Sequence, residues 1–195
     1  ITILKGREIG CMFTTPTILE AIAERISIPQ AGIKGVFVGG TTMTPQYVRF
    51  LTEEVLEGQV NFAPTYGNTL MGLAISRPLT EEDHYSLTYY APQPRAVLRI
   101  VDPKDSTKSM DYEEYGRVEL TTMTKEFFMP RFLERDEAIR RKPCEHFPWD
   151  GVGDVRPFES TKKKFNRGDT ICSNQRHTWQ AQLHTQENQA HASRA

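Results

Sequence analysis

Two adjacent glycines, Gly39 and Gly40, follow a short apolar run at residues 35–38 and precede Thr41. Glycines at the end of a buried strand let a flat ligand approach the backbone, and a helix that begins nearby offers unpaired N–H groups. Open α/β sheets bind ligands at the carboxyl ends of their strands. The pattern therefore indicates a ligand-binding turn. Taken alone, an ordinary strand-to-helix turn is the simpler interpretation.

A second glycine-containing segment carries an aromatic ring and two hydroxyls. Tyr66, Gly67, Asn68 and Thr69 follow the apolar run that ends at Ala63. The ring of Tyr66 can stack on a purine, and the hydroxyls of Thr65 and Thr69 can hold a phosphate or carbonyl oxygen. A tight loop with a packed tyrosine explains the same residues equally well.

A single carboxylate is the third candidate. Residues 116–126 form a β-like run and its turn, and Pro130, Arg135 and Asp136 follow. An aspartate on a loop beside a β unit can accept hydrogen bonds from both hydroxyls of a ribose. The competing interpretation is a surface Arg–Asp ion pair, which contributes about 0–1 kcal/mol. Without further context, the ion pair is the simpler explanation.

The first part of the chain has the pattern of a parallel α/β lobe. Residues 14–26 combine a hydroxyl cap, an early proline and helical apolar spacing, and they predict a helix. Residues 35–38 and 60–63 predict short strands, and a helix that begins at Pro45 and ends near Gly58 separates them. A strand, a helix and a strand in this order predict a parallel pair with a right-handed crossover.

The pattern changes after about residue 87. Residues 96–101 and 116–122 read as β-strands, residues 134–141 predict a short helix, and we expect a small antiparallel or barrel-like β unit. The predicted fold class is α/β, in which a parallel βαβ lobe is followed by this β unit and by a disordered C-terminal tail.

These patterns divide the chain into three parts. We expect an α/β lobe at residues 1–86, a β unit at residues 87–159, and a polar tail at residues 160–195 with too few apolar residues to fold.

The composition is that of a soluble globular protein and excludes several classes. The 195 residues are 25% charged and 38% hydrophobic, with a formal net charge of -1. Such a balance argues against a nucleic-acid surface, and no apolar run reaches the roughly 20 residues that a membrane helix requires. Three scattered cysteines are not a disulfide framework. We expect a cytoplasmic protein, and the sequence gives no oligomeric state.

A zinc site is one further hypothesis. Cys144, Glu145 and His146, together with Cys172 and His177, supply suitable ligands. Their spacing matches no compact zinc template, so the hypothesis ranks low.

In this order, the three candidate segments resemble the adenylate-forming superfamily of acyl- and aryl-CoA synthetases, in particular its phenylacetate–CoA ligase-like branch. The resemblance covers about residues 1–158. Gly39 and Gly40 resemble the family's Gly-Gly loop, which lies against adenine. Residues 66–69 resemble its Tyr-Gly-x-Thr element, which lies beside the adenine and the α-phosphate.

The third segment completes the resemblance. Residues 120–126, with Pro130 and Asp136, are similar to the branch's Thr-Thr-Leu-Thr-Lys-Glu, Pro and Arg-Asp run. This register gives Asp136 the ribose-binding role. The segment is shorter than its family equivalent, so Asp154 is a second candidate for that role.

The resemblance implies ATP, AMP, Mg²⁺ and CoA as ligands of the parent enzyme, with a small carboxylic acid as substrate. Leu70 stands where the family has a glutamate that helps to hold Mg²⁺, so we predict no metal ligand in this chain. Phe37, Thr41 and Met71 are candidate contributors to the acid pocket.

Two family elements are not recognised in the sequence, namely the Gly- and Ser/Thr-rich phosphate loop and the C-terminal domain. We therefore expect a fragment of the N-terminal domain that is inactive alone. One alternative is a non-catalytic remnant that binds a nucleotide or a partner. Another is an acyl-protein synthetase, whose acceptor is a protein thiol.

Overall fold

Nine strands in one sheet, with helices near the N-terminus, make up the computed structural model, which describes residues 1–158. Its first elements are α1 (Thr2–Gly6), β1 (Cys11–Thr14), α2 (Pro16–Ala23), β2 (Gly35–Val38), α3 (Pro45–Phe50) with a π-helical turn η1 (Leu51–Val55), and β3 (Asn61–Asn68). The others are β4 (Gly72–Ser76), a 3-10 turn η2 (Glu81–Asp83), β5 (Thr88–Tyr90), β6 (Ala96–Val101), β7 (Tyr115–Met123), β8 (Phe128–Arg141) and β9 (Gly151–Pro157). The tail predicted at residues 160–195 lies outside the described residues, as do Cys172 and His177.

The sheet changes from parallel to antiparallel at β3. Its strand order is β1-β2-β3-β4-β5-β9-β8-β7-β6. The pairs β1–β2 and β2–β3 are parallel, whereas β3–β4, β4–β5, β5–β9, β6–β7 and β7–β8 are antiparallel. This arrangement confirms the predicted parallel lobe followed by an antiparallel β unit.

Local sequence explains where α2 and α3 begin. The hydroxyl of Thr15 accepts a hydrogen bond from the backbone N–H of Ile18 at 3.4 Å, and that of Thr44 accepts one from Tyr47 at 3.3 Å. Each cap precedes a proline in the first helical turn. A capped N-terminus with an early proline needs no tertiary contact to specify it, which is why both helices were predictable.

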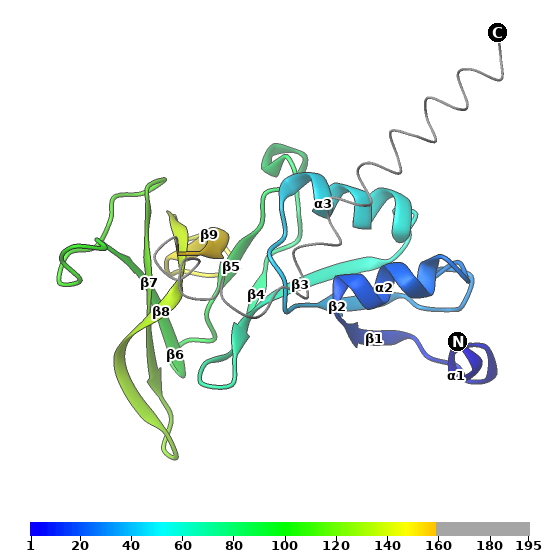
Figure 1. Ribbon diagram of the computed structural model, residues 1–195, viewed down its shortest axis with the longest axis horizontal. Helices are drawn as coiled ribbons and strands as arrows, with labels where there is room; N and C mark the ends of the chain where they lie inside the picture. The colour runs from blue at the N-terminus through cyan, green and yellow to red at the C-terminus, as the bar shows by residue number, and fades with distance from the viewer. Residues whose placement is uncertain (159–195) are drawn as a thin grey trace, which may run out of the picture. The chain divides into compact units, whose positions relative to one another are not determined.

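Helices cover one face of the parallel strands. Val36 and Val38 of β2 are fully buried, in one core with Leu19 of α2 and Val48 of α3. The two helices lie on the same side of β1, β2 and β3 (Figure 1). Side chains alternate across a strand, so Phe37 points to the opposite face, where 41% of its surface is exposed.

Two sequence predictions are wrong. Residues 134–141, predicted as a helix, belong to the strand β8. Backbone pairing with β7, including Gly116 opposite Ala138, overrides the local helical preference. The tight loop that the sequence suggested around Gly67 is also part of a strand, in which Gly67 pairs with Leu73. A Cβ at Gly67 would overlap the carbonyl of Gly72, so the glycine serves a close strand approach rather than a turn.

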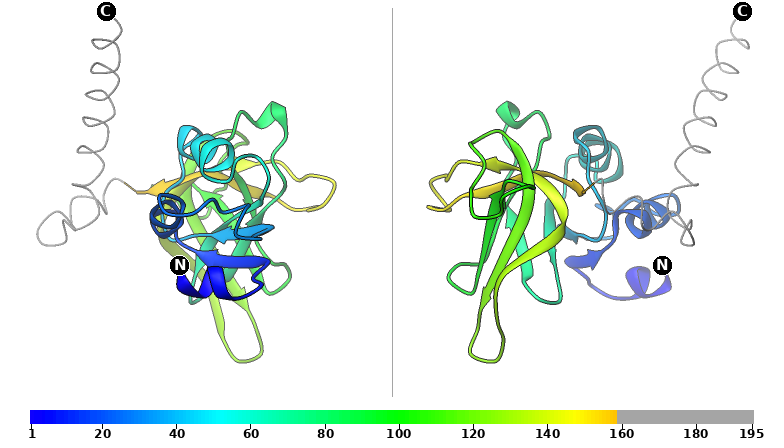
Figure 2. Two further views of the ribbon diagram at one scale, coloured as in Figure 1. Left: turned by 90° about the vertical axis from the view of Figure 1, so that its right-hand side faces the viewer. Right: turned by 60° about the vertical axis from the view of Figure 1, so that its left-hand side comes forward.

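A buried carboxylate links β6, β7 and β8. Glu119 of β7 has 1% of its side chain exposed and accepts hydrogen bonds from Arg99 of β6 at 2.9 Å and Arg131 of β8 at 3.0 Å. Two cations compensate the desolvation of this carboxylate, so removing one of them would leave charge poorly paired. Beyond this network the β7–β8 hairpin extends past the neighbouring strands (Figure 2).

Among residues 1–158, no helix combines the length and apolar character needed to cross a membrane.

Gly116 offers a test of how tightly β7 packs. A Cβ at Gly116 would lie 2.6 Å from the carbonyl oxygen of Val101 and 2.8 Å from Cγ2 of Ile100. We expect Gly116→Ala to lower the free energy of unfolding by about 1–3 kcal/mol, because backbone atoms must shift. Gly10→Ala is the control, since a Cβ there has no neighbour within 4 Å; we expect a change within about 0.5 kcal/mol. Equal urea midpoints for the two variants would contradict the packing.

Candidate functional site

Side chains from β3 and β8 meet, although these strands are not neighbours in the sheet order. The hydroxyl of Tyr66 donates a hydrogen bond to Oδ2 of Asp136 at 3.0 Å. Two residues further along β3, the side-chain amide of Asn68 donates to Oε1 of Glu134. Residues two apart in a strand face the same side, so the two hydrogen bonds form successive rungs between β3 and β8. The structure thus brings together Tyr66, Asn68 and Asp136, which were predicted, and Glu134, which was not.

The double-glycine turn lies against the same part of β3. The buried hydroxyl of Thr65 donates to the carbonyl of Val38 at 3.0 Å. A Cβ at Gly39 would lie 2.7 Å from that hydroxyl, and Gly40 has a φ of 87°, so both positions favour glycine. Thr65 immediately precedes Tyr66, so the predicted adenine turn contacts β3 one residue before the Tyr66 rung, although the two side chains point to opposite faces of the strand.

Polar contacts fix the turn that joins β3 to β4. Oδ1 of Asn68 accepts backbone hydrogen bonds from Leu70 and Met71, each at 2.9 Å. Thr122 of β7 donates to the carbonyl of Leu70 at 3.1 Å, and Arg95 donates to that of Met71 at 3.1 Å. The turn is therefore held by both β3 and the antiparallel strands.

A cavity of about 360 Å³ adjoins this turn. Its lining comprises Thr69, Leu70, Met71, Gly72, Arg95, Thr122, Thr124 and Phe127. It includes Thr69 of the predicted nucleotide-binding residues and Met71 of the candidate acid-pocket residues. The cavity therefore offers space beside the residue that the resemblance places near the α-phosphate.

The Tyr66–Asp136 pair is partly buried, and burial affects the pKa of both groups. Burial raises the pKa of Tyr66, and the neighbouring carboxylates of Asp136 and Glu134 raise it further, so the phenol stays protonated and can donate. Burial also raises the pKa of Asp136, while the Tyr66 hydrogen bond and the charge of Arg135 act in the opposite direction. A carboxylate has about four lone-pair sites, so Asp136 can bind Tyr66 and still accept two hydroxyls of a diol.

The second ribose candidate, Asp154, has different partners. Ser86 donates to its Oδ1 at 3.2 Å, and Arg141 lies 3.7 Å from its Oδ2. Asp154 is near enough to Tyr89 to add to the rise in the pKa of that phenol, which burial mainly causes. The Tyr89 ring lies 5.9 Å from that of Tyr66. The direct polar contact with Tyr66 is made by Asp136.

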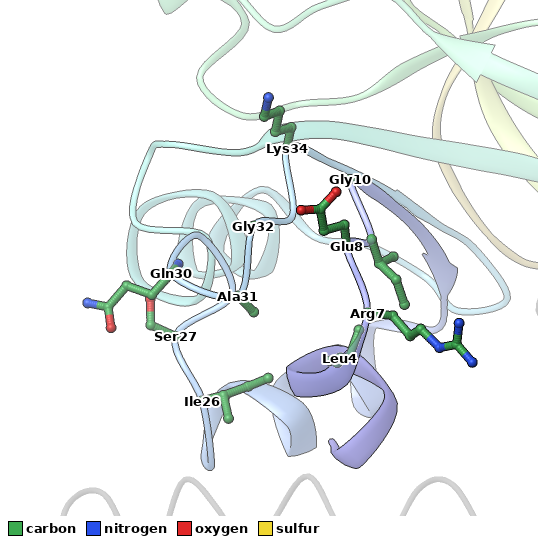
Figure 3. Close-up of a pocket in the computed structure, with 11 residues that line it drawn as sticks. Leu4, Arg7, Glu8, Gly10, Ile26, Ser27, Gln30, Ala31, Gly32 and Lys34 are labelled. Atoms are coloured by element: carbon green, nitrogen blue, oxygen red, sulfur yellow. The ribbon is translucent and has the colours of Figure 1, made fainter.

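A larger cavity, of about 730 Å³, lies away from these residues. Its lining includes Gly10 and Lys34, which precede β1 and β2, so it opens at the amino ends of these strands. Figure 3 shows Arg7 and Gln30 extending away from each other on its opposite sides. Ligands of open α/β sheets bind at the carboxyl ends, and no predicted site residue lines this cavity. Size alone does not make it the better candidate.

The described side chains do not fit a metal site. Within residues 1–158, no group of three or more His, Cys, Asp and Glu side chains is placed to hold an ion. The resemblance implies a Mg²⁺-holding glutamate at the position of Leu70, and a leucine side chain supplies no ligand.

The fold is similar to that of solved adenylate-forming enzymes. An open conformation of 2-hydroxyisobutyryl-CoA ligase, in complex with 2-HIB-AMP and CoA, matches with a TM-score of 0.60 and 14% identity, over 80% of this chain and 35% of the ligase. The luciferase-like enzyme from the nonluminescent mealworm Zophobas morio matches with a TM-score of 0.54 and 16% identity, over 80% of this chain and 39% of that one.

A third match extends the set to peptide synthetases. A nonribosomal peptide synthetase protein containing adenylation and PCP domains has a TM-score of 0.52 and 10% identity, over 76% of this chain and 33% of its own. No family model and no curated protein matches the sequence. The chain spans about a third of the length of the first solved structures that it matches. The described residues therefore have the fold of part of an adenylate-forming enzyme.

Sequence reasoning missed two contributors to the site, Glu134 and the hydroxyl of Thr122. Glu134 precedes Asp136 by two positions, which puts both on one face only if the segment is a strand. The predicted helix at residues 134–141 hid that relationship. The role of Thr122 depends on a contact with Leu70, 52 residues earlier in the chain, for which the sequence carries no local signal.

The raised pKa of Asp136 predicts a stability change at neutral pH. A folded pKa above the ordinary 3.8 means that proton binding stabilises the fold below about pH 3.8, and that this stabilisation is lost as the pH rises through the folded value. Asp136→Asn keeps the shape and an acceptor for Tyr66 but cannot ionise. We expect this variant to have the higher free energy of unfolding at pH 7, with the difference closing in acid.

Asp154→Asn is the matched control for this stability measurement. It weakens an ion pair with Arg141 and should not stabilise the fold. Chemical denaturation of the unsubstituted chain, Asp136→Asn and Asp154→Asn at several pH values measures these free energies of unfolding. A loss of stability at pH 7 in Asp136→Asn would show that the carboxylate is not penalised by burial.

Proposed function

We propose that this chain supplies the adenosine-binding segment of an AMP-forming carboxylic acid ligase of the phenylacetate–CoA ligase type. Gly39 and Gly40 form a shelf for the adenine, and the Tyr66 ring packs beside it. Asp136 accepts hydrogen bonds from the ribose hydroxyls. The division of the chain near residue 86 into an adenine-binding lobe and a ribose-binding β unit stays a prediction.

The observation that carries this proposal is the hydrogen bond between Tyr66 and Asp136. The sequence separates these residues by 70 positions, and only the resemblance assigned both to one nucleoside. Their contact, beside the Gly39 turn, supports a single adenosine site built from three distant segments. A solvent-exposed Arg–Asp ion pair, the competing interpretation, does not account for the tyrosine contact.

In the parent reaction, a carboxylate attacks the α-phosphate of ATP to give an acyl-adenylate and pyrophosphate, and a thiol then displaces AMP. The thiol is that of CoA in this proposal. The chain's own residues bind and orient the nucleoside, which lowers the entropic cost of bringing the reacting groups together. Asn68 shapes the turn that carries Thr69, so that the Thr69 hydroxyl is presented beside the α-phosphate.

Binding, rather than turnover, is the property that we assign to these 195 residues alone. The phosphate loop of the family is not recognised in the sequence, and the cations that neutralise the triphosphate are part of the chemistry. Pyrophosphate release from ATP with an added aryl or fatty acid is the assay that decides this. Release above background would contradict the assignment.

Ribose recognition by Asp136 predicts a specific pattern of affinities. Charge-assisted hydrogen bonds contribute about 1.5–3 kcal/mol, so we expect dideoxy-AMP, which lacks both ribose hydroxyls, to bind about 10- to 100-fold more weakly than AMP. Asp136→Asn should lose a similar factor for AMP and little for dideoxy-AMP. Calorimetry measures the affinity of each protein for each nucleotide. The four affinities show whether Asp136 and the ribose hydroxyls interact.

Asp154→Asn again serves as the control and should bind AMP with the same affinity as the chain without substitutions. If Asp154→Asn erases the preference for AMP over dideoxy-AMP and Asp136→Asn does not, Asp154 holds the ribose. If the parent chain releases no heat with AMP, the chain is an interaction remnant instead of a nucleotide-binding segment.

A further inference from the structure

The Tyr66 side chain is fixed at both of its ends. Its ring packs against Tyr89 of β5, with centroids 5.9 Å apart and planes tilted by 46°. Its hydroxyl donates to Oδ2 of Asp136 at 3.0 Å. A phenol held in this way cannot swing freely, and neither can the carboxylate that accepts from it. The contact therefore orients Asp136 before any ligand arrives.

Groups from β3 and β8 act on this carboxylate. Tyr66 faces it from β3, and Arg135 is its cationic neighbour on β8. Glu134, also on β8, acts on the same phenol, is 7% exposed and accepts from Asn68. Two carboxylates thus lie near one hydroxyl. The proton of that hydroxyl is the polar hydrogen that β3 directs at Asp136, where it favours the anionic form.

We propose that Tyr66 is a positioning residue, whose hydroxyl holds the Asp136 carboxylate in the orientation and the anionic form that a ribose diol binds. This inference rests on the proposed function. It gives the hydroxyl a role separate from that of the aromatic ring beside the adenine. Phenylalanine at this position would keep the ring and lose the role.

The consequence is a pH dependence that a structural role would not produce. An anionic Asp136 accepts both ribose hydroxyls, whereas a protonated one does not, so affinity falls as the pH drops through the pKa of Asp136. The Tyr66 hydrogen bond lowers that pKa against the effect of burial. Tyr66→Phe removes the hydrogen bond and so raises the pKa of Asp136. The loss of affinity at low pH, called here the acid limb of the binding profile, then begins at a higher pH.

The experiment follows adenosine binding by NMR from acid to neutral pH. Adenosine is the probe because, unlike AMP, it carries no phosphate whose own ionisation near pH 6 would enter the profile. We expect the midpoint of the acid limb to lie about one pH unit higher in Tyr66→Phe than in the parent chain. Tyr89→Phe is the matched control, since it removes a neighbouring phenol hydroxyl and should leave the midpoint unchanged.

A second measurement reads the same carboxylate without a ligand. The side-chain carboxyl carbon of Asp136 should titrate at higher pH in Tyr66→Phe than in the parent chain. Replacement of Tyr66 by meta-fluorotyrosine, whose hydroxyl is a stronger donor, should move the titration to lower pH. This second variant keeps the test valid if Tyr66→Phe does not fold.

The outcomes separate the inference from the proposed function. If the parent chain binds adenosine but Tyr66→Phe weakens binding by the same factor at every pH, Tyr66 has only a structural role and the inference is overturned. If the parent chain binds no adenosine at any pH, the proposed function fails and the inference fails with it. Parallel upward shifts in both measurements support the inference.

Discussion

Two side-chain hydrogen bonds between β3 and β8 carry the architecture of the candidate site. The Tyr66–Asp136 and Asn68–Glu134 contacts connect β3 with β8, which three other strands separate in the sheet order. They add to the contacts that Thr122 and Arg95 make with the turn after β3, and to the pairing of β2 with β3. With them, the elements that resemble adenine- and ribose-binding motifs share one location.

The chemistry of these contacts has an energetic cost. Glu134 is almost fully buried and Asp136 partly so, and burial penalises a charged carboxylate. A buried carboxylate that only stabilised the fold would be replaced at little loss by an amide or an apolar residue. Departures from the rules of stable packing, such as a buried carboxylate, are expected at functional or strained sites. This argument favours a binding role for Asp136 independently of the resemblance.

Local sequence was sufficient for the elements whose signals are local. Thr15 and Thr44 cap their helices within one turn, and the apolar run at residues 96–101 indicates the strand β6. The segment at residues 134–141 differs, because its local preference for a helix is overridden by backbone pairing with β7. Candidate site residues emerged only from motif order, since the contact between Tyr66 and Asp136 spans 70 positions.

The central claim is that AMP binds where the β2 turn, β3 and β8 meet, and amide N–H correlation spectra recorded during an AMP titration test it most directly. Glycine amides are well resolved and mark both regions of interest. The account predicts shifts at Gly39, Gly40 and Gly67, with none at Gly10 and Gly32, which line the larger cavity. Chemical-shift changes at Gly10 and Gly32, with unchanged signals at Gly39 and Gly67, would contradict it.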